Sequence, residues 1–127
     1  MVIPVYNSQE SLSELIRSLN ETLKAHCEVW EIILVNDGST DESWSRIKKL
    51  SDNCDQLIGI NLRRNFGQDN AIMAGLKFAS GESIVIMDAF MHFMDTEPEI
   101  TGSINLAETV ASPIRRQASA YELNWLY

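Results

Sequence analysis

Short apolar runs recur over the first part of the chain, and a polar or turn-forming residue follows each one. The runs are Val2–Tyr6, Ile32–Val35, Leu57–Leu62 and Ile84–Met87. Each is too short for a buried helix and rich in β-branched residues, which is typical of strands buried on both faces of a parallel sheet. The pattern therefore predicts a mostly parallel sheet with a strand at each run.

Between these runs, apolar residues recur at three- and four-residue steps, which is the spacing of one helical face. The segments with this spacing are 12–23, 44–50 and 71–79. Ser39 and Glu42 have the spacing of a capping box for the second helix, and Gly81 is a stop signal after the third. Strands that alternate with helices predict an α/β fold with three layers, α/β/α.

The regular pattern stops after Asp88. The apolar residues Phe90, Met91, Phe93 and Met94 follow, and weak helical spacing recurs at 104–110 and 118–126. We interpret residues 1–89 as one α/β domain, truncated after its fourth strand, and residues 90–127 as an atypical tail.

Composition limits the classes of partner. The chain has 127 residues, 45% of them hydrophobic, and a formal net charge of -8. So acidic a protein repels a phosphate backbone, which argues against nucleic acid as a partner. A bound phosphate must then be held locally, by a divalent cation or by backbone N–H groups. Cys27 and Cys54 lack zinc-site spacing, and no run of about 18 apolar residues occurs, so we expect reduced thiols in a soluble, cytoplasmic protein.

Polar residues and glycines follow every predicted strand. In an open α/β sheet the ligand binds beyond the carboxyl ends of the strands, so these residues form the candidate site. They are Tyr6 and Asn7, then Asn36, Asp37, Gly38 and Ser39, then Arg63, Arg64, Asn65 and Gly67, and finally Asp88.

The residue types suit a nucleotide. The carboxylate of Asp37 can accept from a base N–H or a ribose hydroxyl, and Gly38 allows a turn tight enough for a ligand to approach. The guanidinium of Arg64 matches the oxygens of a diphosphate. Alternatively, Asp37 and Ser39 cap the following helix and the arginine belongs to a solvated loop. Neither G-x-G-x-x-G nor G-x-x-x-x-G-K-[ST] occurs, which disfavours a Rossmann dinucleotide site and a P-loop.

Five motifs carry a resemblance to a known family. They are V-I-P-V-Y-N at 2–7, V-N-D-G-S-T-D at 35–41, R-N-F-G-Q at 64–68, A-I-M-A-G-L at 71–76 and I-V-I-M-D-A at 84–89. In this order they resemble family 2 glycosyltransferases. Within that family they are most similar to the polyprenyl-phosphate sugar transferases, which include dolichol-phosphate mannose synthase and the bactoprenol glucosyltransferases.

The resemblance implies a GT-A fold that binds a nucleotide-diphosphate sugar and a divalent metal, Mg or Mn. It also implies transfer of the sugar, with inversion, to a polyprenyl phosphate in membrane-associated full-length relatives. Carried over by position, Pro4, Tyr6 and Asp37 would line the nucleoside pocket, and Asn65 and Gly67 would border it.

The same resemblance implies a metal site at the end of the last motif. Asp88 falls on the first acid of a D-x-D motif, whose second acid is replaced here by Phe90. His92 stands where the family has glutamine, and histidine can ligate manganese, so Asp88 and His92 are the implied metal ligands. Such a metal would neutralise the departing diphosphate. The alternative for His92 is ordinary packing beside Met91 and Phe93.

Our leading hypothesis is that the chain is the donor-binding half, residues 1–89, of an inverting glycosyltransferase. No acceptor half or catalytic base is recognisable in 90–127, so turnover by this chain is expected to be weak or absent. A shifted reading frame and a truncated natural variant would both produce such a tail. The alternative hypothesis is a non-catalytic nucleotide-binding module that self-associates through Phe90–Met94.

Overall fold

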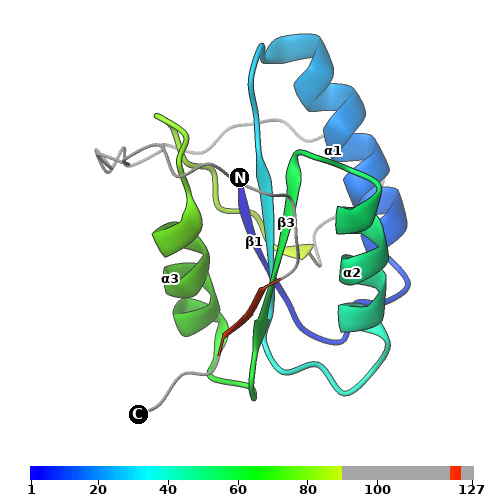
Figure 1. Ribbon diagram of the computed structural model, residues 1–127, viewed down its shortest axis with the longest axis vertical. Helices are drawn as coiled ribbons and strands as arrows, with labels where there is room; N and C mark the ends of the chain where they lie inside the picture. Colours follow the sequence, from blue (N-terminus) through cyan, green and yellow to red (C-terminus); the bar gives the residue numbers. More distant parts are fainter. Residues whose placement is uncertain (90–120, 124–127) are drawn as a thin grey trace.

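The computed structural model describes residues 1–89 and 121–123 of the chain (Figure 1). Its elements are, in order, β1 (Val2–Val5), α1 (Leu12–His26), β2 (Ile32–Asn36), α2 (Ser43–Asp52), β3 (Leu57–Leu62), α3 (Gln68–Phe78) and β4 (Tyr121–Leu123). The predicted alternation of strand and helix is confirmed from β1 to α3.

The strands form one parallel sheet in the order β1-β2-β3-β4. Val5 pairs with Asn36, and Asn36 pairs with Asn61, so the carboxyl ends of β1, β2 and β3 lie level. The predicted α/β class and parallel sheet are therefore confirmed. Loops that leave these strand ends meet at one edge of the sheet.

The predicted fourth strand at Ile84–Met87 is wrong as a regular buried strand. This segment makes a single parallel bridge, between Ile86 and Val2. Val2 N donates to Val85 O at 2.8 Å, Met87 N donates to Val2 O at 3.1 Å, and Ile86 is 50% exposed. An apolar run indicates a tendency to be buried, whereas a regular ladder also needs an aligned partner over several residues. Here β1 supplies that partner at one position.

The fourth strand of the sheet is β4 instead. It pairs in parallel with β3 over Ile60–Leu62, at positions where the spacing predicted a helix over 118–126. That prediction is wrong for residues 121–123. The pairing depends on backbone groups of β3, some sixty residues earlier in the chain, so local spacing could not indicate it.

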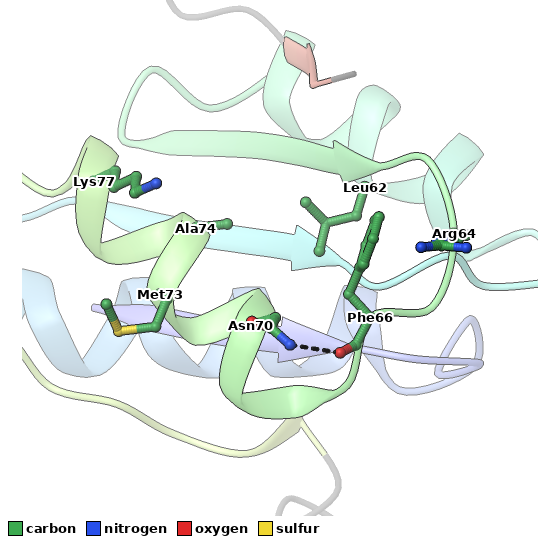
Figure 2. Close-up of a pocket in the computed structure, with 7 residues that line it drawn as sticks. All are labelled: Leu62, Arg64, Phe66, Asn70, Met73, Ala74 and Lys77. Carbon is green, nitrogen blue, oxygen red and sulfur yellow. Dashed lines mark hydrogen bonds between the residues drawn. The ribbon is translucent and has the colours of Figure 1, made fainter. Parts of the chain in front are cut away.

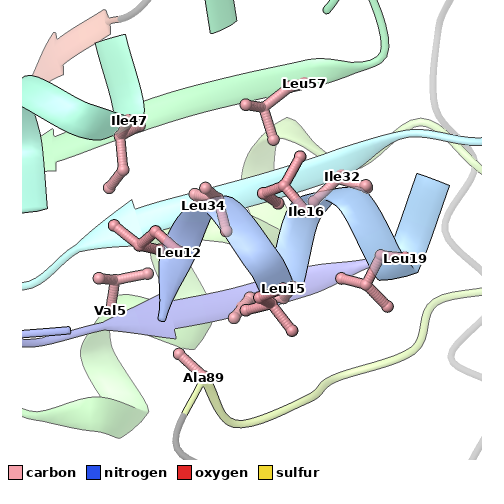
Figure 3. Close-up of a cluster of buried hydrophobic side chains, with 11 residues drawn as sticks. Val5, Leu12, Leu15, Ile16, Leu19, Ile32, Leu34, Ile47, Leu57 and Ala89 are labelled. Carbon is pink, nitrogen blue, oxygen red and sulfur yellow. The ribbon is translucent and has the colours of Figure 1, made fainter. Parts of the chain in front are cut away.

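Helices cover both faces of the sheet, with α1 and α2 on one face and α3 on the other (Figure 1). The core under α1 and α2 is shown in Figure 3 and consists of Ile3, Val5, Leu12, Leu15, Ile16, Leu19, Ile32, Leu34, Ile47, Leu57 and Ala89. The core under α3 consists of Val2, Ile33, Val35, Ile58, Ile60, Leu62, Ala71, Ala74 and Ala79. Neighbouring residues of each strand thus enter opposite cores, as the two-residue period of a strand requires. The predicted three-layer arrangement is confirmed.

The segments on either side of β1 in the sheet are reached by chain connections that run in opposite directions. The chain steps from β1 to β2 to β3 with α1 and α2 on one face, and α3 then returns it across the other face to residues 85–87 beside β1. Because crossovers between parallel strands are right-handed, a return step must place its helix on the opposite face. The gap between the ends of β1 and residues 85–87 is therefore a topological switch point, where open α/β sheets bind ligands.

A polar pair interrupts the apolar sheet near this edge. The Nδ2 of Asn36 donates to the Oδ1 of Asn61 at 2.7 Å, and Asn36 is buried. Its own Oδ1 has no hydrogen-bond partner among the described residues. A buried amide with an unmet acceptor lowers stability. The hydrogen bond between the two side chains offsets part of this cost.

We predict that the two asparagines are energetically coupled. Asn61→Leu should lower the free energy of unfolding by about 1–3 kcal/mol, because it leaves the amide of Asn36 buried without its acceptor. Asn36→Leu combined with Asn61→Leu should restore most of that loss, since no buried polar group then remains unpaired. Urea unfolding of the two single variants and the double variant measures this coupling. Additive losses would show that the pair is not coupled.

Candidate functional site

A pocket of about 370 Å³ lies at the switch point. The residues that line it are Pro4, Val5, Tyr6, Ser8, Asp37, Asn65, Gly67, Gln68, Asp88 and Ala89. Six residues predicted from the sequence are therefore brought together: Pro4, Tyr6, Asp37, Asn65, Gly67 and Asp88. The pocket combines a half-exposed aromatic ring, that of Tyr6, with the start of α3 and an exposed carboxylate, that of Asp88.

The carboxylate of Asp37 has a structural function in this pocket. It is 3% exposed, and its Oδ1 and Oδ2 accept from the backbone N–H groups of Phe66 and Gly67 at 2.7 Å and 3.0 Å. Hydrogen bonds to an ionised acceptor are stronger than neutral ones. Asp37 thus ties the end of β2 to the loop between β3 and α3. Each carboxylate oxygen still has a second lone pair for a ligand.

Gly38 is required by the protein's own backbone. Its φ is 64°, and a Cβ at this position would lie 2.3 Å from the carbonyl carbon of Arg64 and 2.3 Å from the amide nitrogen of Asn65. The close approach predicted for a ligand is therefore made by the loop after β3. Gly38 does not line the pocket; it lets that loop close over β2.

Gly67 meets a different requirement. Its φ is 93°, and a Cβ there would meet nothing within 4 Å, so its conformation and not crowding favours glycine. It is the N-cap residue of α3, and both Gly67 and Gln68 line the pocket. The positive end of the helix dipole consequently lies at the pocket, where it favours an anion.

Asn7 does not line the pocket. It has a φ of 47°, its backbone N–H donates to Ser39 Oγ at 3.0 Å, and its Oδ1 accepts from the N–H and hydroxyl of Thr40 at 2.9 Å and 3.3 Å. The structure therefore places this predicted nucleotide-binding residue in contact with the loop after β2.

Further hydrogen bonds join the same two loops. Ser8 N donates to Ser43 Oγ at 2.9 Å, Gln9 N donates to Asp41 Oδ2 at 3.2 Å, and Glu42 N donates to Gln9 Oε1 at 2.9 Å. We call the hydrogen bonds between residues 7–9 and residues 39–43 the loop clasp. The clasp fixes the start of α1 against the start of α2.

The capping box predicted for Ser39 and Glu42 is wrong. The hydroxyl of Ser39 accepts from Asn7, and α2 begins at Ser43, whose backbone N–H donates to Asp41 Oδ1 at 2.9 Å. Burial raises the pKa of Asp41, but hydrogen bonds donated by Ser43 and Gln9 outweigh it and hold the pKa below its ordinary value of 3.8. Asp41 thus does the capping that spacing assigned to Ser39.

Arg64 is directed to another pocket. Figure 2 shows this pocket, of about 410 Å³, which is lined by Leu62, Arg64, Phe66, Asn70, Met73, Ala74 and Lys77. The guanidinium carbon of Arg64 lies 4.7 Å from the centroid of the Phe66 ring. Residues of the loop after β3 thus alternate, Arg64 and Phe66 facing this pocket and Asn65 and Gly67 facing the switch point.

The described residues contain no group of three His, Cys, Asp or Glu side chains that could hold a metal ion. Asp88 lines the switch-point pocket and is exposed. His92 and the patch Phe90–Met94 lie outside the described residues, so their predicted roles stay predictions. Among residues 1–89 and 121–123, no helix combines the length and apolar character needed to cross a membrane.

Sequence reasoning missed residues of two kinds. Val5, Ser8, Gln68 and Ala89 line the pocket because they flank the predicted residues. Gln9, Thr40 and Asp41 belong to the loop clasp, in which each hydrogen bond joins residues more than thirty positions apart along the chain. The available signal for Ser8 and Gln9 was that each is a polar residue two or three positions beyond the end of the predicted strand Val2–Tyr6.

The strand order, the switch point and the pocket define an open α/β domain of the doubly wound type. The sequence model of the family described as Glycosyl transferase family 2 matches residues 1–90 of the chain. The chain belongs to glycosyl transferase family 2, and the predicted family is confirmed.

Curated relatives carry a consistent name. The undecaprenyl-phosphate 4-deoxy-4-formamido-L-arabinose transferases of Salmonella choleraesuis (strain SC-B67) and Salmonella newport (strain SL254) are 48% identical to this chain over 90 residues. The alignments cover 70% of this chain and 28% of each relative. The chain thus spans little more than a quarter of the length of these relatives.

A solved structure supports the fold. The crystal structure of S. aureus TarS 1-349 has a TM-score of 0.57 and 28% sequence identity to this chain, and the match covers 69% of this chain and 26% of the chain in that structure. With the family assignment, this similarity confirms the predicted GT-A fold for the matched part of the chain.

We predict that Gly38→Ala destabilises the fold more than Gly67→Ala. Both changes place a side chain in an unfavourable backbone conformation at positive φ, which costs about 1–3 kcal/mol, but only the first adds a clash with the backbone of Arg64 and Asn65. Gly38→Ala should therefore lower the free energy of unfolding by about 3 kcal/mol or more. Urea unfolding measures both values, and equal losses would show that the loop does not press on Gly38.

We predict a pH-dependent contribution from Asp41. Because its folded-state pKa is lowered, its carboxylate stabilises the fold above the ordinary value of 3.8, and this stabilisation is lost as the pH falls through the folded-state pKa. The free energy of unfolding should exceed that of Asp41→Asn by about 1 kcal/mol or less at neutral pH, the size of a helix cap. Urea unfolding of both proteins from pH 7 down to ~2.5 should show the difference shrinking. If the difference in the free energy of unfolding between the two proteins grew as the pH fell, the lowered pKa of Asp41 would be contradicted.

Proposed function

We propose that the switch-point pocket binds the nucleotide part of a nucleotide-diphosphate sugar. The observation that carries this proposal is the convergence of Pro4, Tyr6, Asp37, Gly67 and Asp88 on one pocket. They come from the ends of β1 and β2, the start of α3 and the segment after residue 87. Residues so far apart in the chain line one pocket at the position where this fold class binds ligands.

Each part of the pocket suits one part of the ligand. The ring of Tyr6 is 49% exposed and can cover a base, while the remaining lone pairs of Asp37 can accept from a base N–H or a ribose hydroxyl. The N-terminus of α3, at Gly67 and Gln68, suits the negative diphosphate. Arg64 lies in the neighbouring pocket, so its proposed diphosphate contact requires a ligand that extends past the loop after β3.

A divalent ion, Mg or Mn, fits this pocket with one protein anchor. Magnesium is commonly held by one or two carboxylates together with phosphate oxygens of the substrate, and Asp88 is an exposed carboxylate that lines the pocket. His92 is proposed as a further ligand from the family resemblance. Such an ion would stabilise the negative charge of the departing diphosphate.

We propose that full-length proteins of this kind transfer the sugar to a polyprenyl phosphate. An oxygen of the acceptor phosphate forms a bond to the anomeric carbon, while the bond between that carbon and the donor diphosphate breaks and the diphosphate leaves with the electron pair. Attack from the opposite face inverts the anomeric centre. The names of the relatives, undecaprenyl-phosphate transferases, support this acceptor class. The proposed contribution of residues 1–89 is donor binding.

A second candidate is a non-catalytic nucleotide-binding module. It is favoured by one observation, that Phe90 replaces the second acid of the family's D-x-D motif. Self-association through Phe90–Met94, outside those residues, belongs to this candidate. The two candidates differ in the metal dependence of nucleotide binding.

A thermal-shift titration with uridine diphosphate and guanosine diphosphate, with and without manganese, tests these proposals. Ligand at a hundred times its Kd should stabilise the fold by about 2.7 kcal/mol and raise the Tm. For a donor site the shift should need manganese and shrink in Asp88→Asn. Asp55→Asn, which removes an exposed carboxylate that lines neither pocket, is the matched control and should keep the full shift.

Shifts that are independent of manganese would favour the binding module over the transferase donor site. No shift with either nucleotide would refute nucleotide binding by this chain.

A further inference from the structure

Asn7 is the residue of the loop clasp that directly follows the pocket residue Tyr6. It follows Tyr6, which lines the pocket, yet its own polar groups contact Ser39 and Thr40 of the next loop. Neither Asn7 nor Ser39 lines the pocket. A residue placed in this way can affect a ligand only through its neighbours.

The conformation of Asn7 depends on those contacts. Its φ of 47° lies in the left-handed region, which is unfavourable for residues other than glycine and which asparagine tolerates better than most. The hydrogen bond that its backbone N–H donates to Ser39 and those that its Oδ1 accepts from Thr40 stabilise this conformation. Losing either bond allows residue 7 to return to the common right-handed or extended regions.

Such a change would redirect Tyr6. The backbone of Tyr6 connects directly to residue 7, and its carbonyl accepts from Ser8 Oγ at 3.0 Å, on the other side of Asn7. Because the ring of Tyr6 is half exposed, little packing holds it once its backbone turns. The position of the ring at the pocket is therefore set by the turn at Asn7.

We propose that Asn7 is a positioning residue that acts through Tyr6, and that the loop clasp sets the affinity of the pocket for the nucleotide. This inference rests on the proposed nucleotide site and gives Asn7 a different function from direct contact with the ligand. A ring already held in place does not have to be ordered when the nucleotide binds, and preorganisation of this kind increases affinity.

The test measures the Kd of uridine diphosphate and guanosine diphosphate by calorimetry, and the Tm without ligand, on the full chain. Asn7→Gly keeps the positive φ accessible but removes Oδ1, and Ser39→Ala removes the acceptor for the Asn7 N–H. Each should weaken nucleotide binding by about three- to tenfold, the range expected when one side chain must be ordered on binding. Ser39→Thr, which keeps the hydroxyl, should restore the affinity.

Two controls separate positioning from a general effect on stability. Ser80→Ala removes another contact between distant loops, the hydrogen bonds from Ser80 Oγ to Glu31, and should change the Tm while leaving the Kd unchanged. In a Tyr6→Leu background, Asn7→Gly should cause no further loss of affinity, because the residue through which it acts is gone.

Each remaining result is decisive. A lower Tm with an unchanged Kd in Asn7→Gly and Ser39→Ala would show that the clasp is only structural and would overturn the inference alone. A loss of affinity that persists in the Tyr6→Leu background would also overturn it, because Asn7 would then act without Tyr6. Absence of binding by the unaltered chain would overturn the proposed function together with the inference.

Discussion

Two backbone N–H groups of the loop after β3 share one buried carboxylate, that of Asp37, and the pocket depends on this contact. It holds Gly67, and with it the start of α3, against the end of β2. Gly38 makes the contact possible, because any side chain there would meet the backbone of Arg64 and Asn65. Without this closure, the helix terminus and the residues after β1 would not face the same space.

The same contact bears on how an acidic chain could bind the proposed anionic ligand. The formal net charge is -8, so the overall field opposes a diphosphate. The pocket instead offers the N-terminus of α3 at short range, and two carboxylates of unequal accessibility. Asp37 is buried and accepts hydrogen bonds from two backbone N–H groups, whereas Asp88 is exposed and suited to a cation. Local dipoles can outweigh a distant net charge because screening weakens the latter.

Prediction succeeded where a short pattern is sufficient to specify structure. Apolar runs and helical spacing located β1, α1, β2, α2, β3 and α3, and the residues after the predicted strands include half of those that line the pocket. It failed at Ile84–Met87 and at β4, because strand pairing depends on which distant backbone is available. It also failed at Ser39, whose hydroxyl accepts a hydrogen bond from the backbone N–H of Asn7 and does not cap α2.

The sequence by itself determined the alternation of strand and helix, the sheet's burial on both faces, the family and the residues that reach the carboxyl edge. These follow from periodicity and from motifs that are local in the chain. Only the tertiary structure decided how those residues are used: Asp37 holds a loop, Gly38 admits that loop, Arg64 faces another pocket, and Asn7 joins the loop clasp. The reason is physical, since a polar group bonds to whichever partner the fold brings within about 3 Å, and that partner lies thirty residues away.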